Sequence, residues 1–244
     1  MSTYVYGIVL AAHPGLPEGL AGIGDPPNPV RTVREGDLAA VVSDAPAELR
    51  PKRRDLLAHQ HVLTEAGTSG AVLPLRFGSL SDDDAAVRAA LAGQAEHYRE
   101  QLGRLDGRVE YNVKAVHHEE AVLRLVVHEN SEVRALTEAN RAAGGGSYQD
   151  KLRLGELVAN GVKTREVHDA KAVEAALAPH AEQHSHGPET SGWLVNLSFL
   201  LDRAESAAFL NAVEEFRQAN PQLDVQATGP LPPYSFVSTE RATA

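Results

Sequence analysis

The sequence predicts an α+β protein of two domains, each an incomplete or modified ferredoxin-like α/β sandwich, with extra helices in the second domain. Three observations support this prediction. A chain of 244 residues is long enough for two domains of ordinary size. In both halves, apolar segments that suit strands are interleaved with segments of helical periodicity. Asp106 and Gly107 end a helical segment, so we expect domains at residues 1–107 and 108–237 and a flexible tail at 238–244.

The first half begins with YVYGIVL at residues 4–10. These residues are apolar on both alternating faces, so we expect a central strand that is covered on two sides. Residues 13–29 are rich in glycine and proline, which disfavour a packed helix. The first domain is therefore expected to lack a helix. Two short strands then flank Gly36 and Asp37, which suit a tight hairpin turn.

A helix and an edge strand follow in the first half. Residues 52–66 form an amphipathic helix that Gly67 ends, because apolar residues recur at near-helical spacing, at Leu56, Leu57, Leu63 and Ala66. The segment AVLPLRF at residues 71–77 suits a strand that Pro74 confines to a sheet edge or a bulge. A capping box of Ser81 and Asp84 predicts helix as far as residue 105, with a break near Gly93.

The second half starts with RVEYNVKAV at residues 108–116, which alternates apolar and polar side chains and so predicts a strand with one exposed face. Helices are expected at residues 118–128 and 132–142. A longer helix begins at Ser147, which forms a capping box with Asp150, and Pro179 is expected to kink or end it. The remaining elements are an apolar strand at 192–202, a helix that carries Phe209, Val213 and Phe216, and a strand at 223–229.

The composition limits the classes of partner. The chain has 23 basic and 33 acidic residues, and its net charge of −10 argues against binding to nucleic acid. It has no cysteine, which excludes disulfides and thiolate metal sites. The sequence contains neither a signal peptide nor a run of about eighteen apolar residues, so we expect a cytoplasmic protein without a membrane span.

Histidines raise the question of a metal site. In HAEQHSH, a helix would place His180 and His184 one turn apart, with His186 nearby, but no HExxH motif is present. Pro179 before this segment and a Gly-Pro pair after it favour a solvated polar loop. We therefore assign no metal and no cofactor to the chain.

Other polar groups have equally simple interpretations. His61 and Glu65 would share a helix face, either as an acid–base pair or as a surface ion pair. His117 and His118 lie at a strand–helix junction and are interpreted as incidental. The segment AAGGGSYQD can hold an anion or simply connect two helices. The sequence contains no motif of a catalytic nucleophile, so no residues argue for an enzyme, although an enzymatic function is not excluded.

Four cations gather where the helix at residues 52–66 begins. Positive charge at a helix N-terminus is unfavourable by about 0.3–1 kcal/mol per charge. This conflict indicates either a surface that is kept for a partner or an ordinary solvated corner. The candidate partner-binding residues here are Arg50, Lys52, Arg53 and Arg54.

Four segments together resemble the GvpL/GvpF family of gas vesicle accessory proteins. They are YVYGIV at residues 4–9, HQHVLTEAGTSGAVLPLRFGSL at 59–80, VEYNVKAV at 109–116 and TGPLPPYSFV at 228–237. Leu231 stands where the family usually has tryptophan, and Tyr111 and Asn112 replace its Trp-Gly pair. These departures concern partner contacts rather than the fold, and they do not distinguish an L-type from an F-type member.

The resemblance implies a non-enzymatic, chaperone-like role in gas vesicle assembly, without a cofactor. It implies binding to the small shell protein and to other accessory proteins, in the cytoplasm and at the gas vesicle; self-association stays open. The alternative function is a small-molecule or haem-binding enzyme on a ferredoxin-like scaffold, with His59 or His61 as the ligand.

The segment TGPLPPYSFV supplies two further candidate contacts. Its prolines hold the chain extended, so Tyr234 and Phe236 are presented to a partner with little loss of entropy. We expect most of the segment to cover the second sheet, with one of the two aromatic residues left for a partner. Complete burial of the segment as a plug of the core is the other interpretation.

Overall fold

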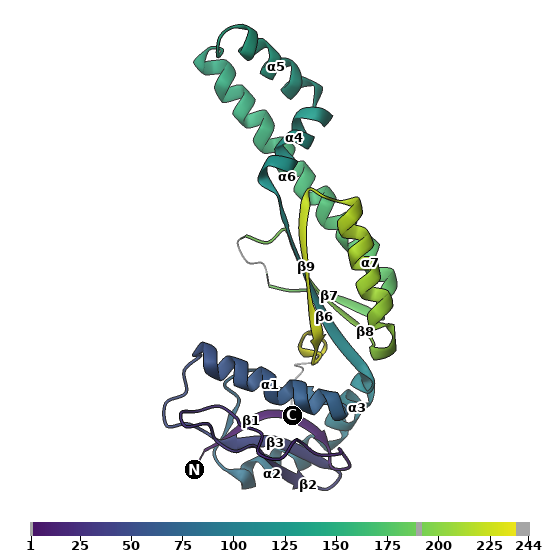
Figure 1. Cartoon of the computed structure of the whole chain (residues 1–244). Helices are drawn as coiled ribbons and strands as arrows, with labels where there is room; N and C mark the ends of the chain where they lie inside the picture. Colours follow the sequence, from purple (N-terminus) through teal and green to yellow (C-terminus); the bar gives the residue numbers. More distant parts are fainter. Residues whose placement is uncertain (1, 189–191, 238–244) are drawn as a thin grey trace. The chain divides into compact units, whose positions relative to one another are not determined.

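The computed structural model describes residues 2–188 and 192–237. Helices and antiparallel sheets occur in both halves, so the α+β class is confirmed. The chain divides into two compact units (Figure 1). Unit 1 contains the chain up to Tyr111, Leu200–Arg203 and the chain from Gly229 onward, and unit 2 contains Asn112–Phe199 and Ala204–Thr228. This division differs from continuous domains at 1–107 and 108–237; the tail expected at 238–244 lies outside the described residues.

The sheet of unit 1 consists of β1 (Thr3–Leu10), β2 (Arg31–Glu35), β3 (Leu38–Asp44), β4 (Leu73–Pro74) and β5 (Leu80–Ser81). Its order is β2-β3-β1-β4, and β5 also pairs with β1. The predicted central position of β1 is thus confirmed, and Pro74 lies on the edge strand β4. In the hairpin between β2 and β3, Gly36 has a φ of 57°, a left-handed value that glycine adopts readily.

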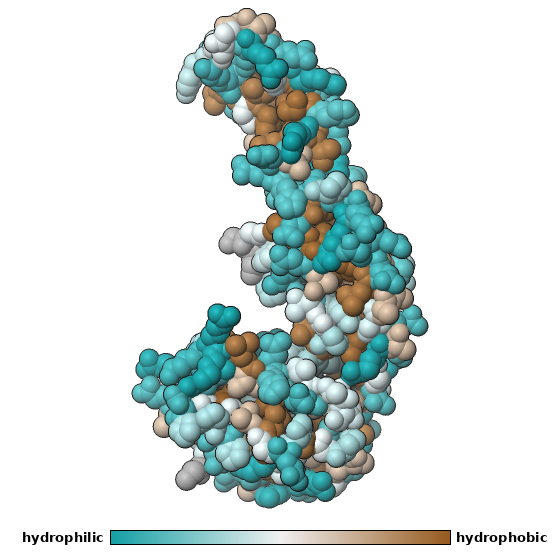
Figure 2. All heavy atoms as spheres, in the orientation of Figure 1, coloured by the Kyte–Doolittle hydropathy of each residue, from teal (hydrophilic) through white to brown (hydrophobic). Residues whose placement is uncertain are grey.

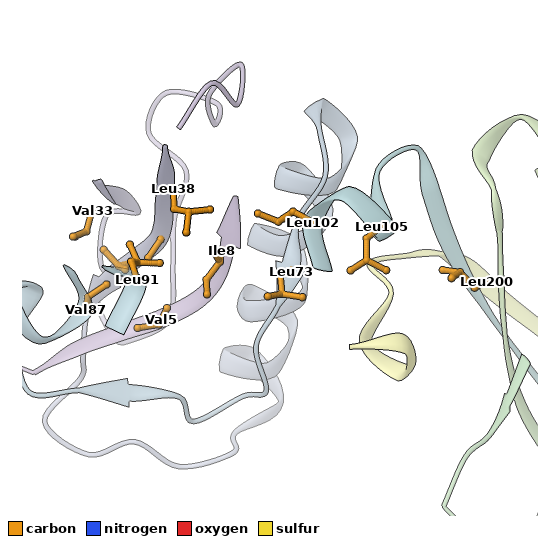
Figure 3. Packing of buried hydrophobic residues seen from close by; sticks show 12 residues of the cluster. Val5, Ile8, Val33, Leu38, Leu73, Val87, Leu91, Leu102, Leu105 and Leu200 are labelled. Atoms are coloured by element: carbon orange, nitrogen blue, oxygen red, sulfur yellow. The ribbon is translucent and has the colours of Figure 1, made fainter. Parts of the chain in front are cut away.

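Both faces of β1 are covered, and a β-bulge determines which residues face each way. Tyr4, Tyr6 and Val9 belong to the buried cluster that includes residues of α1 (Arg53–Ser69). Val5 and Ile8 belong to the opposite cluster, which includes residues of α2 (Asp84–Gly93) and α3 (Ala95–Leu105) (Figure 3). Because the register shifts between Val5 and Gly7, the alternation of faces moves by one residue after the bulge.

The helices of unit 1 differ from the prediction in three details. Gly67 does not end α1, which continues to Ser69. The buried face of α1 consists of Asp55, His59, Val62, Leu63 and Ala66, whereas Leu56 and Leu57 are 42% and 54% exposed. Apolar spacing alone thus predicts the inner face only in part: Leu63 and Ala66 are buried as expected, and Leu56 and Leu57 are not. The helical region after Ser81 is divided near Gly93 as predicted, but Asp83 caps α2, because its Oδ1 accepts the N–H of Ala86 over 2.8 Å.

The second sheet is formed by β6 (Arg108–His117), β7 (Gln183–His186), β8 (Val195–Asp202) and β9 (Leu223–Leu231), in the order β7-β8-β6-β9. Three helices lie between β6 and β7 in the chain, α4 (Glu119–Glu129), α5 (Ser131–Ala142) and α6 (Tyr148–Leu177), and α7 (Ser206–Ala219) lies between β8 and β9. Without α4 and α5, this is the β-α-β-β-α-β sequence of a ferredoxin-like unit.

The two sheets share one topology. Counted along the chain within each sheet, both have the order second, third, first, fourth strand. In unit 1 the segment between β1 and β2 takes the place of the first helix. This is the expected pair of modified ferredoxin-like sheets, with a helix missing from the first and extra helices in the second.

Most element boundaries of the second half agree with the prediction. Ser147 and Asp150 form the capping box of α6, and Pro179 lies in the 3-10 turn that follows this helix. Two predictions are wrong: residues 183–186 form the strand β7 instead of a loop, and Glu110 is buried although the alternation of β6 placed it on the exposed face. Among the described helices, none combines the length and the apolarity that a membrane crossing requires.

Candidate partner-binding surface

The outer face of α1 combines cationic and apolar side chains. A helix turns by about 100° per residue, so Arg53, Leu57 and Gln60 share a stripe that lies opposite to the buried Val62. Leu57 lies in the middle of this stripe with 54% of its surface exposed, and Leu56 borders it. The solvent face of an amphipathic helix ordinarily carries polar residues. Figure 2 shows hydrophobic spheres among hydrophilic ones at the surface of unit 1.

The four predicted cations lie at the start of α1 and divide into two pairs. Arg54 binds Asp25 over 2.7 Å and Arg50 binds Glu48 over 3.2 Å, so neighbouring carboxylates offset these two charges. Lys52 and Arg53 are exposed, and within the described ranges their side chains form neither a hydrogen bond nor an ion pair. The positive charge that remains for a partner therefore belongs to Lys52 and Arg53, beside the exposed leucines.

The C-terminal segment lies on the second sheet only in part: residues 228–231 form the end of β9, and the residues that follow pack within unit 1. Pro232 and Pro233 are buried, and Tyr234–Phe236 form a 3-10 turn. Tyr234 packs against the cluster that contains Tyr4 and Tyr6, and Phe236 packs against the opposite cluster. Both aromatic side chains are half-buried. This packing favours the interpretation as a plug of the core, and a partner contact through either residue stays a prediction.

Glu110 holds this segment in place. The N–H of Ser235 donates to Oε2 of Glu110 over 2.8 Å, and its hydroxyl donates to Oε1 over 2.7 Å. Burial raises the pKa of Tyr234, and the negative charge of Glu110 acts in the same direction. Tyr234 is thus a neutral packing residue at ordinary pH.

His59 lies in the core of unit 1, where both ring nitrogens have partners. Its Nε2 lies 3.1 Å from the carbonyl oxygen of Leu75, and its Nδ1 lies 2.9 Å from the hydroxyl of Tyr4. A carbonyl only accepts, so Nε2 carries the proton; burial lowers the pKa of His59, so the ring is neutral and Nδ1 accepts from Tyr4. Neither nitrogen remains for a haem iron. His61 is exposed, and its Nδ1 lies 3.8 Å from Oε1 of Glu65 on the surface of α1.

In unit 2, His184 and His186 converge on Glu174 of α6, a residue that the sequence analysis did not single out. The Nε2 atoms of His184 and His186 lie 2.9 and 3.5 Å from Oε1 of Glu174. The favoured interpretation of this segment is a solvated polar loop, but residues 183–186 form the strand β7, which places His184 and His186 on one face. Within the described residues, His180 lies outside this group.

A second polar cluster of unit 2 surrounds the buried Asp169. Its carboxylate accepts hydrogen bonds from His117 (2.9 Å), Arg165 (3.0 Å), His168 (3.0 Å) and Gln222 (3.4 Å). Burial raises the pKa of Asp169, but the four donors outweigh this effect and lower the pKa to about 2. The interpretation of His117 as incidental is therefore wrong.

The glycine-rich segment before α6 is a connection between helices. The N–H and the hydroxyl of Ser147 both donate to Oδ2 of Asp150, over 3.2 and 2.7 Å. This carboxylate lies where an anion would bind at the start of α6. The segment therefore offers little to an anionic ligand.

Comparisons with known proteins extend over the whole chain. The sequence model of the family described as "Gas vesicle synthesis protein GvpL/GvpF" matches residues 2–238. Gas vesicle protein F of Streptomyces sp. (strain CB03234) is 58% identical over 237 residues, which cover 97% of this chain and 100% of that protein. Gas vesicle protein L of the same strain is 31% identical, over an alignment that covers 96% of this chain and 91% of that protein.

Two crystal structures have the same fold. The gas vesicle protein GvpF from Anabaena sp. PCC7120 matches with a TM-score of 0.77 at 23% identity, over 98% of this chain and 99% of that chain. The GvpF from Microcystis aeruginosa matches with a TM-score of 0.71 at 22% identity, over 97% and 99%.

Proposed function

Because this chain belongs to the GvpL/GvpF family of gas vesicle synthesis proteins, we propose that it binds the small shell protein and other accessory proteins during gas vesicle assembly. It acts in the cytoplasm and at the gas vesicle as a chaperone-like factor, without catalysis and without a cofactor. Its identity of 58% to a protein F, against 31% to a protein L, supports an F-type role.

The physical basis of this role is the shielding of an apolar surface. A shell subunit presents an apolar face to gas, and copies that expose this face before assembly would aggregate. A binding partner that covers the face keeps the subunit soluble until it is incorporated. The net charge of −10 on this chain helps to keep such a complex in solution.

The observation that carries the proposal is the outer stripe of α1. Leu56 and Leu57 supply apolar contact area, and Lys52 and Arg53 supply positive charge beside it. A helix with an apolar face and an acidic border complements this stripe, because apolar contacts provide affinity and the charges fix the register. We assign such a helix to the shell protein.

Co-expression with the small shell protein, followed by a pull-down, tests the proposal. Leu57→Glu is expected to reduce the affinity at least about tenfold, which corresponds to about 1.4 kcal/mol. The control is Leu152→Glu, the same change at a leucine of α6 that is 55% exposed, compared with 54% for Leu57. If Leu57→Glu binds as well as the control, α1 is not the contact surface. If the unchanged chain retains no shell protein, the proposed function is wrong.

A further inference from the structure

We propose that Glu174, His184 and His186 form a binding site for a divalent transition-metal ion such as Zn²⁺. We refer to these three residues as the His–Glu cluster. Glu174 comes from α6, and the two histidines come from β7. Their three ligand atoms, Oε1 of Glu174 and the two Nε2 atoms, lie within 4.8 Å of one another.

The separations of the ligand atoms suit zinc. Tetrahedral zinc has bonds of about 2.0–2.1 Å to nitrogen and oxygen, so neighbouring ligand atoms lie roughly 3.3 Å apart. The distances from Oε1 of Glu174 to Nε2 of His184 and of His186 are 2.9 and 3.5 Å, on either side of that value. Two imidazoles and one carboxylate are also a ligand set that proteins use for zinc with an open fourth position.

The surrounding structure orients the three side chains. His184 and His186 are two residues apart in a strand, so both leave the same face of the sheet. The ring of His184 lies 6.1 Å from the ring of Phe199 in β8, and Phe199 packs against Phe209 of α7. On α6, the neighbour of Glu174 is Val173, which is fully buried and anchors the helix at this point.

A pocket beside the cluster leaves room for a fourth ligand. Its volume is about 680 Å³, and Glu174 and His186 both line it. Water in this pocket can complete the coordination. Lys171 also lines the pocket, and its positive charge opposes cation binding. The repulsion acts on every divalent cation, so the choice of metal follows from the ligands: two imidazoles suit Zn²⁺, Cu²⁺ and Ni²⁺ better than Mg²⁺ and Ca²⁺, which prefer oxygen ligands.

A bound ion would join β7 to α6. β7 has only four residues and lies at the edge of its sheet, so it is held on one side alone. Metal binding to the folded form would stabilise unit 2, because the ligands come from two elements that are brought together only by folding.

Isothermal titration calorimetry with zinc chloride tests the site on the full chain without a polyhistidine tag. We expect one ion per chain, and a loss of affinity of at least about tenfold in Glu174→Ala and in His186→Ala. The control is His180→Ala, which removes a nearby histidine outside the cluster and should bind zinc like the unchanged chain. Equal affinity in the cluster variants and the control would mean that zinc binds elsewhere, and absence of binding to the unchanged chain would overturn the proposal equally.

Hydrogen exchange gives a local measurement on the same proteins. Zinc should slow the exchange of the amides in residues 183–186 of the unchanged chain and of His180→Ala, but not of Glu174→Ala. The measurement on the unchanged chain needs no variant, so it tests the site even where a substitution weakens folding. Exchange in β7 that does not respond to saturating zinc would contradict the proposed link between β7 and α6. The site is independent of shell-protein binding, which is assigned to α1.

Discussion

Tyr4 donates its hydroxyl hydrogen to Nδ1 of His59 over 2.9 Å in the core of unit 1. The same oxygen accepts the N–H of Gly78 over 3.2 Å. One side chain of β1 thereby connects α1 to the turn that follows β4. Burial raises the pKa of Tyr4, so its hydroxyl keeps the proton that this arrangement needs.

Tyr4→Phe is expected to lower the free energy of unfolding of unit 1 by about 1–3 kcal/mol, because Nδ1 of His59 loses its donor and the N–H of Gly78 loses its acceptor. Denaturant unfolding followed by circular dichroism measures the effect. Tyr148→Phe is the control, since Tyr148 is 81% exposed and its change should stay within about 0.5 kcal/mol. Equal stability of the two variants would show that the buried hydroxyl contributes nothing.

Asp169 is expected to make the stability of unit 2 depend on pH in acid. Its pKa in the folded chain is about 2 and its ordinary value is 3.8. The folded state therefore favours the charged form, and this stabilisation is complete above about pH 4 and is lost as the pH falls through about 2. With allowance for solvent screening around the partly exposed donors, it amounts to on the order of 1–2 kcal/mol.

Asp169→Asn tests this linkage. The fluorescence of Trp193, the one tryptophan of the chain, follows the unfolding of unit 2. The variant should be less stable at neutral pH and should lose part of the pH dependence between about 4 and 2. Asp82→Asn, at an exposed aspartate of unit 1, should keep the dependence. An unchanged pH profile in Asp169→Asn would assign the acid sensitivity of unit 2 to other carboxylates.

Local patterns in the sequence predict those elements for which neighbouring residues suffice. The apolar run of β1, the turn at Gly36 and the capping box of Ser147 with Asp150 each act within a few residues, and all three are found in the structure. The missing helix of unit 1 follows equally from the prolines and glycines between β1 and β2. Such local signals are sufficient to predict the α+β class.

Distant partners explain the elements that local patterns predict wrongly. Asp55 and His59 can be buried on α1 only because Gly24, Tyr4 and Leu75 supply their hydrogen bonds. Glu110 can be buried because Ser235 donates two hydrogen bonds to its carboxylate, and no local pattern reveals this partner, which lies 125 residues later in the chain. These distant hydrogen bonds also explain the candidate partner-binding surface. Because Asp55 and His59 occupy part of the inner face of α1, Leu56 and Leu57 lie on its outer face.

Truncation after Thr228 is expected to destabilise unit 1. It removes Tyr234 and Phe236 from the two core clusters and leaves the buried Glu110 without the donors of Ser235. Hydrogen exchange of β1 measures the loss, and truncation after Val237, which keeps the whole described C-terminal segment, is the control. A chain that ends at Thr228, protects β1 fully and yet binds no shell protein would support the partner contact instead of the core plug.

Gly161→Ala and Gly155→Ala are expected to change the stability of unit 2 in opposite directions, although both lie in α6. A Cβ on Gly161 would lie 2.5 Å from Cγ1 of Val126 in α4, a buried and β-branched residue that cannot easily turn away. Overpacking costs about 1–3 kcal/mol, which outweighs the gain of about 1 kcal/mol in helix propensity. At Gly155 an added Cβ meets no described atom within 4 Å, so the propensity gain remains. Thermal unfolding followed by circular dichroism compares the two, and a Gly161→Ala variant as stable as Gly155→Ala would refute the close packing of α4 on α6.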